Sequence, residues 1–123
     1  MYGSFEDLEV WKAGRTLRKE IALLVKSFPE NEKYRLTDQI VRSSRSVTAN
    51  IAEGHGRFHY IDNAKFCRNS RGSLQETWDH LITAFDEEYI NKETLDEFDK
   101  KVKHCLKLLN GYILYLKKKK MDN

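Results

Sequence analysis

Apolar residues recur at spacings of three and four along four successive segments of the chain, and this periodicity constrains the fold more than any other feature of the sequence. The stripes run through Val10, Gly14, Leu17, Ile21, Leu24 and Phe28; Leu36, Ile40, Val47 and Ile51; Ala64, Cys67, Arg71, Leu74, Trp78, Leu81 and Phe85; and Leu95, Phe98, Val102, Cys105, Leu109, Tyr112 and Leu116. An α-helix has about 3.6 residues per turn, so each stripe marks one face of an amphipathic helix. No segment shows the alternation that is typical of a β-strand.

Local signals place the ends of these helices. Ser4 and Asn91 are suitable N-caps, and Pro29 ends the first helix because the residue before a proline avoids helical dihedral angles. Gly54 and Gly56 are natural terminators of the second helix. The expected helices cover about 5–28, 33–54, 61–88 and 91–119. Four helices with short connections predict an all-α fold, an antiparallel up-and-down four-helix bundle that forms a single domain over residues 1–123.

Composition narrows the functional class. No apolar run approaches the ~20 residues that cross a bilayer, and the N-terminus lacks the pattern of a secretion signal, so we expect no membrane partner and a cytoplasmic protein. Cys67 and Cys105 fall at core-facing positions without metal-type spacing, which indicates buried free thiols. The net charge of +3 is by itself weak support for a nucleic-acid partner.

A row of polar residues lies beside the apolar stripe of the second helix and has a counterpart on the third. One interpretation is a hydrogen-bonded network that joins the two helices or two subunits. Its members would be Asn50, Glu53, Arg57, Arg71, Ser73 and Glu76. Arg71 interrupts an apolar seam, so it would need Glu53 or Glu76 as a partner. Gly72 costs about 1 kcal/mol in mid-helix, which favours a position where a neighbouring helix comes close.

The second interpretation is a surface that binds RNA or DNA. Basic residues gather around the second helix and the start of the third, and two aromatic side chains beside them could stack on unpaired bases. The candidates are Arg42, Arg45, Arg57, Phe58, Tyr60, Lys65 and Arg68. The lysines at 117–120 are either a solvated helix end or a further phosphate contact.

Catalysis finds little support in the sequence. His55 and His59 are separated by a helix-breaking glycine, so no fixed geometry holds them as a metal pair. Glu76 and His80 have no second copy of the kind found in di-iron bundles. We therefore expect no enzyme activity, no metal and no cofactor.

Four motifs carry a family resemblance over nearly the whole chain. They are FEDLEVWKA at 5–13, FPENEKYRLTDQI at 28–40, SVTANIAEGHGR at 46–57 and RGSLQE at 71–76. With these motifs the chain resembles the four-helix-bundle proteins encoded in intervening sequences of bacterial 23S rRNA genes, often called S23 ribosomal protein. The chain departs from that family at Ser43 and Ser44, where small apolar residues are common, and at Arg71, where an alanine-type residue is common.

The resemblance implies a non-enzymatic homopentamer. A distant relative, the accessory protein of diversity-generating retroelements, binds nucleic acid and a reverse transcriptase. We therefore expect a homo-oligomeric module that binds RNA or DNA through a basic surface of the assembled ring. The alternative is a protein-binding scaffold or accessory subunit for a polymerase or retroelement enzyme.

Overall fold

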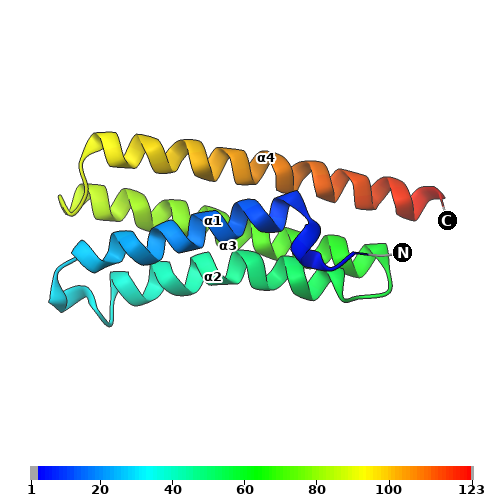
Figure 1. Ribbon diagram of the computed structural model, residues 1–123, viewed down its shortest axis with the longest axis horizontal. Helices are drawn as coiled ribbons and strands as arrows, with labels where there is room; N and C mark the ends of the chain where they lie inside the picture. Colours follow the sequence, from blue (N-terminus) through cyan, green and yellow to red (C-terminus); the bar gives the residue numbers. More distant parts are fainter. Residues whose placement is uncertain (1–2, 123) are drawn as a thin grey trace.

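The computed structural model describes residues 3–122 and shows four helices packed side by side (Figure 1). The helices are α1 (Glu9–Leu24), α2 (Leu36–His55), α3 (Tyr60–Asp86) and α4 (Lys92–Asp122). Three short 3-10 turns, η1 (Phe5–Asp7), η2 (Val25–Ser27) and η3 (Glu30–Glu32), flank α1 and precede α2. Within residues 3–122 there is no β-strand, so the predicted all-α class is confirmed.

Successive helices run in opposite directions. One end of the bundle carries η1, the α2–α3 turn and the C-terminal end of α4, and the other carries the α1–α2 and α3–α4 connections (Figure 1). Helix α2 packs between α1 and α3, and α4 packs against α3 and α1. This is the predicted antiparallel up-and-down bundle.

The first two helices differ from their expected boundaries, and the first ends earlier than Phe28, because α1 gives way to η2 at Val25. The first helix is interrupted at Leu8, whose extended backbone separates η1 from α1, and the hydroxyl of Ser4 accepts from the backbone N–H of Glu6 (3.3 Å) instead of capping α1. The second helix begins at Leu36, because the residues after Pro29 form η3. The predicted cap at Asn91 is present, since its Oδ1 accepts from the backbone N–H of Thr94 (2.8 Å).

The core is built from the four predicted stripes. Their most deeply buried members include Leu17, Ile21, Ile40, Val47, Ile51, Leu74, Leu81, Leu109 and Leu116. Cys67 and Cys105 are buried free thiols, as predicted, and burial raises the pKa of each to about 11. Both therefore remain protonated at neutral pH and act as small apolar side chains.

Helices α2 and α3 approach closely at Gly54, near the end of α2, where no larger residue would fit. A Cβ added there would lie 2.9 Å from the Cβ of Phe66 and 3.0 Å from the carbonyl oxygen of Asn63. Both atoms belong to α3, so the missing side chain brings α2 and α3 together just before the turn that joins them. The expectation that Gly72 admits a neighbouring helix is not met inside the subunit, because no heavy atom of the described residues lies within 4 Å of an added Cβ.

This contrast predicts opposite effects of two alanine substitutions. Gly54→Ala should lower the free energy of unfolding by about 1–3 kcal/mol, because the added methyl overpacks the α2–α3 contact. Gly72→Ala should raise it by about 0.5–1 kcal/mol, because it removes a mid-helix glycine and meets open space. Urea denaturation of both variants measures the difference. Stabilisation of equal size in the two would contradict the close approach at Gly54.

Candidate nucleic-acid interface

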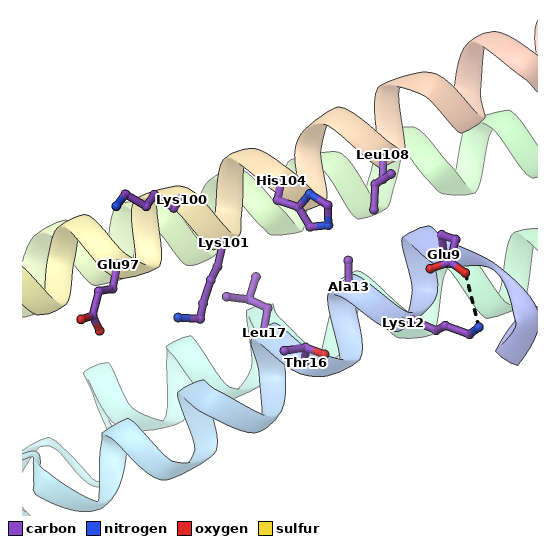
Figure 2. A pocket seen from close by; sticks show the side chains of 10 residues that line it. All are labelled: Glu9, Lys12, Ala13, Thr16, Leu17, Glu97, Lys100, Lys101, His104 and Leu108. Atoms are coloured by element: carbon purple, nitrogen blue, oxygen red, sulfur yellow. Dashed lines mark hydrogen bonds and ion pairs between the residues drawn. The ribbon is translucent and has the colours of Figure 1, made fainter.

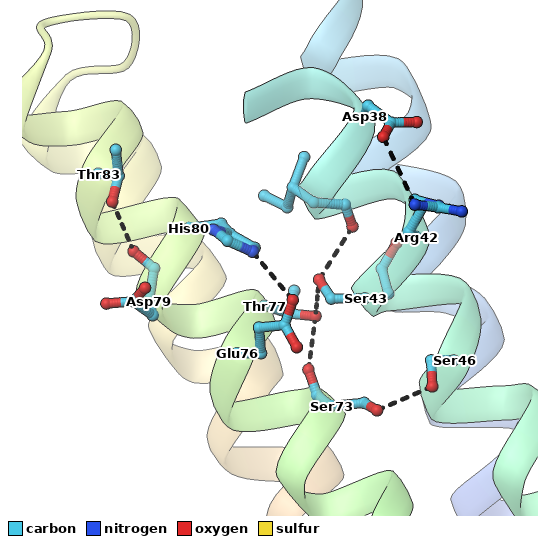
Figure 3. Close-up of polar contacts among 12 residues, drawn as sticks. Asp38, Arg42, Ser43, Ser46, Ser73, Glu76, Thr77, Asp79, His80 and Thr83 are labelled. Atoms are coloured by element: carbon cyan, nitrogen blue, oxygen red, sulfur yellow. Dashed lines mark hydrogen bonds and ion pairs between the residues drawn. The ribbon is translucent and has the colours of Figure 1, made fainter. Parts of the chain in front are cut away.

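Paired hydroxyl groups join α2 to α3 (Figure 3). The hydroxyls of Ser46 and Ser73 hydrogen-bond at 2.8 Å, and those of Ser43 and Thr77 do so at the same distance. The second pair is buried, and Thr77 also donates to the carbonyl of Ser73 (2.9 Å). These small side chains let the two helices approach while every buried hydroxyl keeps a partner.

The same contact continues toward the α2–α3 turn. Ser70 on α3 donates to the carbonyl of Val47 on α2 at 2.7 Å. Asn50 donates its Nδ2 to both the carbonyl and the hydroxyl of Ser46, each at 2.9 Å. The structure therefore joins Asn50 and Ser73 of the predicted polar row through the hydroxyl of Ser46.

The charged members of that row do not converge. Glu53 is exposed and pairs with Arg57 in the α2–α3 turn, with 3.7 Å between Oε2 and Nε. Glu76 pairs with His80 one turn along α3, at 3.2 Å (Figure 3). Arg71 points toward α4. The predicted contact of Arg71 with Glu53 or Glu76 is therefore wrong.

Arg71 needs no buried carboxylate because its long side chain reaches the edge of the α3–α4 seam. Its guanidinium Nη1 donates to Oδ1 of Asn110 at 2.9 Å, in an exposed contact. A half-buried arginine can lay its methylene groups on apolar surface and keep its charge in water.

The predicted nucleic-acid surface splits into two parts. Arg42 and Arg45 are exposed near the middle of α2, and Arg42 lies 3.9 Å from the carboxylate of Asp38 (Figure 3). At 1.5 Å per residue, Arg42 is about 20 Å along the helix from the α2–α3 turn. The other candidates, Arg57, Phe58, Tyr60, Lys65 and Arg68, occupy that turn and the first turns of α3. Arg57, Phe58 and Tyr60 line one pocket, and Tyr60 and Arg68 line the depression beside it, whereas Lys65, Arg42 and Arg45 line neither.

The C-terminal end of α4 completes this group. A pocket of about 400 Å³ separates the α2–α3 turn from α4, with Phe58, His59 and Tyr60 on one side and Tyr115 and Leu116 on the other. An adjoining depression of about 360 Å³ shares Tyr60 and Leu116 and is lined by Arg68, Lys117 and Lys120. We call these two hollows and their residues the basic–aromatic end. Tyr115 is not among the residues predicted from the sequence, although an aromatic side chain outside the apolar stripe of α4 is a signal for such a site.

A third hollow, between α1 and α4, has a mixed lining. It measures about 470 Å³, and Ala13 and Leu17 face His104 and Leu108 across it (Figure 2). Two of its lysines pair with carboxylates: Lys12 lies 3.4 Å from Glu9 and Lys101 lies 3.6 Å from Glu20. This groove therefore presents no concentrated charge of either sign.

The described residues meet neither the requirements of a metal site nor those of a membrane-spanning helix. Among residues 3–122, no group of three or more His, Cys, Asp or Glu side chains could hold a metal ion. None of the described helices is both long enough and apolar enough to cross a membrane.

The fold and this site define a small all-α protein with one hollowed, cationic and aromatic end. The chain belongs to the 23S rRNA-intervening sequence protein family, whose model matches residues 6–111. This confirms the resemblance found in the sequence.

A solved structure supports the same assignment. It is a protein of unknown function from the S23 ribosomal protein family of Bacteroides thetaiotaomicron, and it superposes with a TM-score of 0.78 at 25% identity. The match covers 85% of this chain and 94% of that one. No curated protein matches the chain.

The α2–α3 contact generates a prediction about stability. Ser43→Ala and Thr77→Val should each lower the free energy of unfolding by about 1 kcal/mol, because each removes a buried hydrogen bond between helices. The double variant should lose less than the sum, with a coupling of about 0.5–1.5 kcal/mol, since the first substitution already breaks the shared bond. Glu53→Ala is the control and should change stability by less than about 0.5 kcal/mol, because its ion pair is exposed.

Urea denaturation of the four proteins of the cycle measures the coupling. Strict additivity of Ser43→Ala and Thr77→Val would show that the hydroxyl pair does not join the helices. A large decrease in the free energy of unfolding of Glu53→Ala would show that the charged residues belong to the network after all.

Proposed function

We propose that this protein is a non-catalytic, homo-oligomeric module that binds RNA or DNA through its basic–aromatic end. The observation that carries the proposal is the meeting of two separate sequence features at one place in the fold. Arg68 comes from the early part of α3, Lys117 and Lys120 come from the end of α4, and the three side chains line one depression. Their side chains offer the cationic surface that phosphate groups need.

The small net charge conceals a strong segregation along α3 and α4. In α3 the charged residues from 65 to 71 are basic and those from 76 to 86 are acidic, apart from a histidine, whereas in α4 the acidic residues gather at 93–99 and Lys117–Lys120 lie near the C-terminal end. The two helices are antiparallel, so their basic ends lie together (Figure 1). Such a field attracts a polyanion to one end of the bundle and orients it there.

Self-association would strengthen this attraction. Several apolar side chains are exposed on the subunit, among them Leu23, Ile82 and Leu114, and Gly72 and Gly111 leave open space on helix surfaces. These features support contacts between copies, and the family resemblance supports five copies. A ring with its basic ends facing one way would multiply the modest charge of each subunit. The cytoplasm is the compartment that we propose for it, in keeping with the two free thiols.

The family is named after an intervening sequence of 23S rRNA, and the solved relative belongs to the S23 ribosomal protein family. Structured ribosomal RNA is therefore the first ligand to test. A second candidate function is an accessory subunit or scaffold for a polymerase, such as a reverse transcriptase. The groove between α1 and α4 favours this candidate, because its paired charges and apolar floor suit a protein surface better than a polyanion.

Charge removal at the end of α4 tests the main proposal. Replacing Lys117, Lys118, Lys119 and Lys120 together by Gln should weaken binding to a structured RNA at least about tenfold at low salt and reduce the salt slope. The reason is that fewer counterions are released when fewer cations meet phosphates. Fluorescence anisotropy across a salt series measures both quantities, and circular dichroism confirms that the helices are retained.

A matched control removes the same charge elsewhere. The exposed lysines Lys19, Lys26, Lys100 and Lys107 changed to Gln should leave the affinity within about a factor of three, since only the long-range field changes. Equal losses in the two variants would show that net charge alone drives binding. If the wild-type protein binds no RNA or DNA at low salt, the accessory-subunit function replaces this one.

Assembly is tested by the mass in solution. Light scattering should give about five times the subunit mass of 14.6 kDa, independent of dilution over the micromolar range. A monomer mass across that range would contradict the ring.

A further inference from the structure

Phe58 is the most exposed large apolar side chain of the described residues, with 99% of its surface accessible. It lies in the short turn between α2 and α3, beside Arg57 and His59. A phenyl ring held in water contributes nothing to the core, so the fold itself does not account for an aromatic residue here. Exposed aromatic side chains beside arginine are typical of surfaces on which nucleobases stack.

The pocket beside Phe58 has a fixed floor. Asn63 at the start of α3 donates its Nδ2 to the hydroxyl of Tyr112 on α4 at 3.1 Å, which ties the two helices at this level. The ring of Tyr112 stacks on that of Tyr115, with an angle of 13° between their planes and 6.1 Å between their centroids. Tyr115 is about half exposed and forms the wall opposite the turn.

The pocket and its neighbour differ in chemistry in a way that matches a nucleic-acid strand. The 400 Å³ pocket is rich in aromatic and imidazole rings, whereas the adjoining 360 Å³ depression presents Arg68, Lys117 and Lys120. The two share Tyr60 and Leu116, so they form one continuous surface. A single strand has the same alternation, because each flat, apolar base is joined to a charged phosphate.

We propose that the pocket between the α2–α3 turn and α4 accepts one unpaired nucleobase, stacked against Phe58 and Tyr115, while Arg68, Lys117 and Lys120 hold the adjacent phosphates. This inference rests on the proposed function and names its ligand class, a single strand or an unpaired segment of a folded RNA. A duplex offers its phosphates to the lysines but keeps its base faces stacked inside, so it can occupy the cationic depression and leave the pocket empty.

The test compares two probes at one salt concentration by fluorescence anisotropy. One is an oligothymidylate of about 12 nucleotides, within the site sizes of known single-strand-binding folds. The other is the same strand paired with its complement. The wild-type protein should bind the single strand at least about tenfold more tightly than the duplex, because one stacked base is worth roughly a tenfold to hundredfold change.

Phe58→Ala should lower the affinity for the single strand at least about tenfold. It should change the affinity for the duplex by no more than about twofold, because the phosphate contacts remain. Phe58→Trp should restore the preference and Phe58→Leu should not, which separates stacking from simple apolar contact. Tyr34→Ala is the matched control: Tyr34 is an aromatic residue 84% exposed near the start of α2, at the opposite end of the bundle, and both affinities should be unchanged. Phe58 and Tyr34 are both exposed, so neither substitution disturbs the core.

The outcomes separate this inference from the proposed function. If the wild type binds both probes equally and Phe58→Ala binds as the wild type does, the base pocket is refuted and binding through the lysines stands. If Phe58→Ala weakens both probes alike, the turn contacts phosphate or backbone and the base pocket is again refuted. If neither probe nor the structured RNA binds at low salt, both proposals are refuted.

Discussion

The contact of α2 with α3 is the constraint on which the basic–aromatic end of this protein depends. Small residues line it: Gly54 lets the two backbones approach, and hydroxyl pairs such as Ser43–Thr77 satisfy the polar groups that the approach buries. Because the helices are so close at Gly54, the connection between them is reduced to a short turn. Within that turn the guanidinium of Arg57 lies over the ring of Phe66 on α3, 4.8 Å from the ring centroid, whereas Phe58 projects into solvent.

A second constraint, the length of α4, supplies the other half of the site. The last turns of α4 extend past the α2–α3 turn and place Lys117–Lys120 at the same end (Figure 1). The helix tolerates four consecutive lysines there, because cations are favoured near the exposed carbonyl groups of a C-terminus. Tyr112 and Tyr115 then face the turn across a pocket that neither α4 nor the turn could form alone. The proposed function therefore arises from tertiary structure more than from any single motif.

The sequence predicts the bundle well because burial follows helical periodicity. The stripe positions Ile40, Val47 and Leu109 are fully buried, and Asn91 caps α4 as its side chain suggests. Periodicity states which face of a helix is covered, but it does not state which neighbour covers it. Arg71 illustrates the limit: it lies on the expected face, yet its partner is Asn110 of α4 and no carboxylate.

The same limit explains the partial prediction of the candidate site. The aromatic and basic composition of residues 57–60 is visible in the sequence, and so is the lysine run, but their distance is not. Arg42 and Arg45 are near the group in the sequence, but Arg42 lies about 20 Å from the α2–α3 turn along the axis of α2, and neither residue lines the two hollows. Gly72, which suggests a close contact within the subunit, faces open space there, and Gly54 makes the close contact instead.

The most direct test of the account is photo-cross-linking of the assembled protein to a single-stranded RNA that carries 4-thiouridine, followed by mass spectrometry of the linked peptides. If the basic–aromatic end contacts the nucleic acid, cross-links should fall within residues 57–68 and 112–120, with Phe58 and Tyr115 foremost. Cross-links confined to the middle of α2 around Arg42 and Arg45, or to the opposite end around Tyr34 and Tyr89, would contradict it.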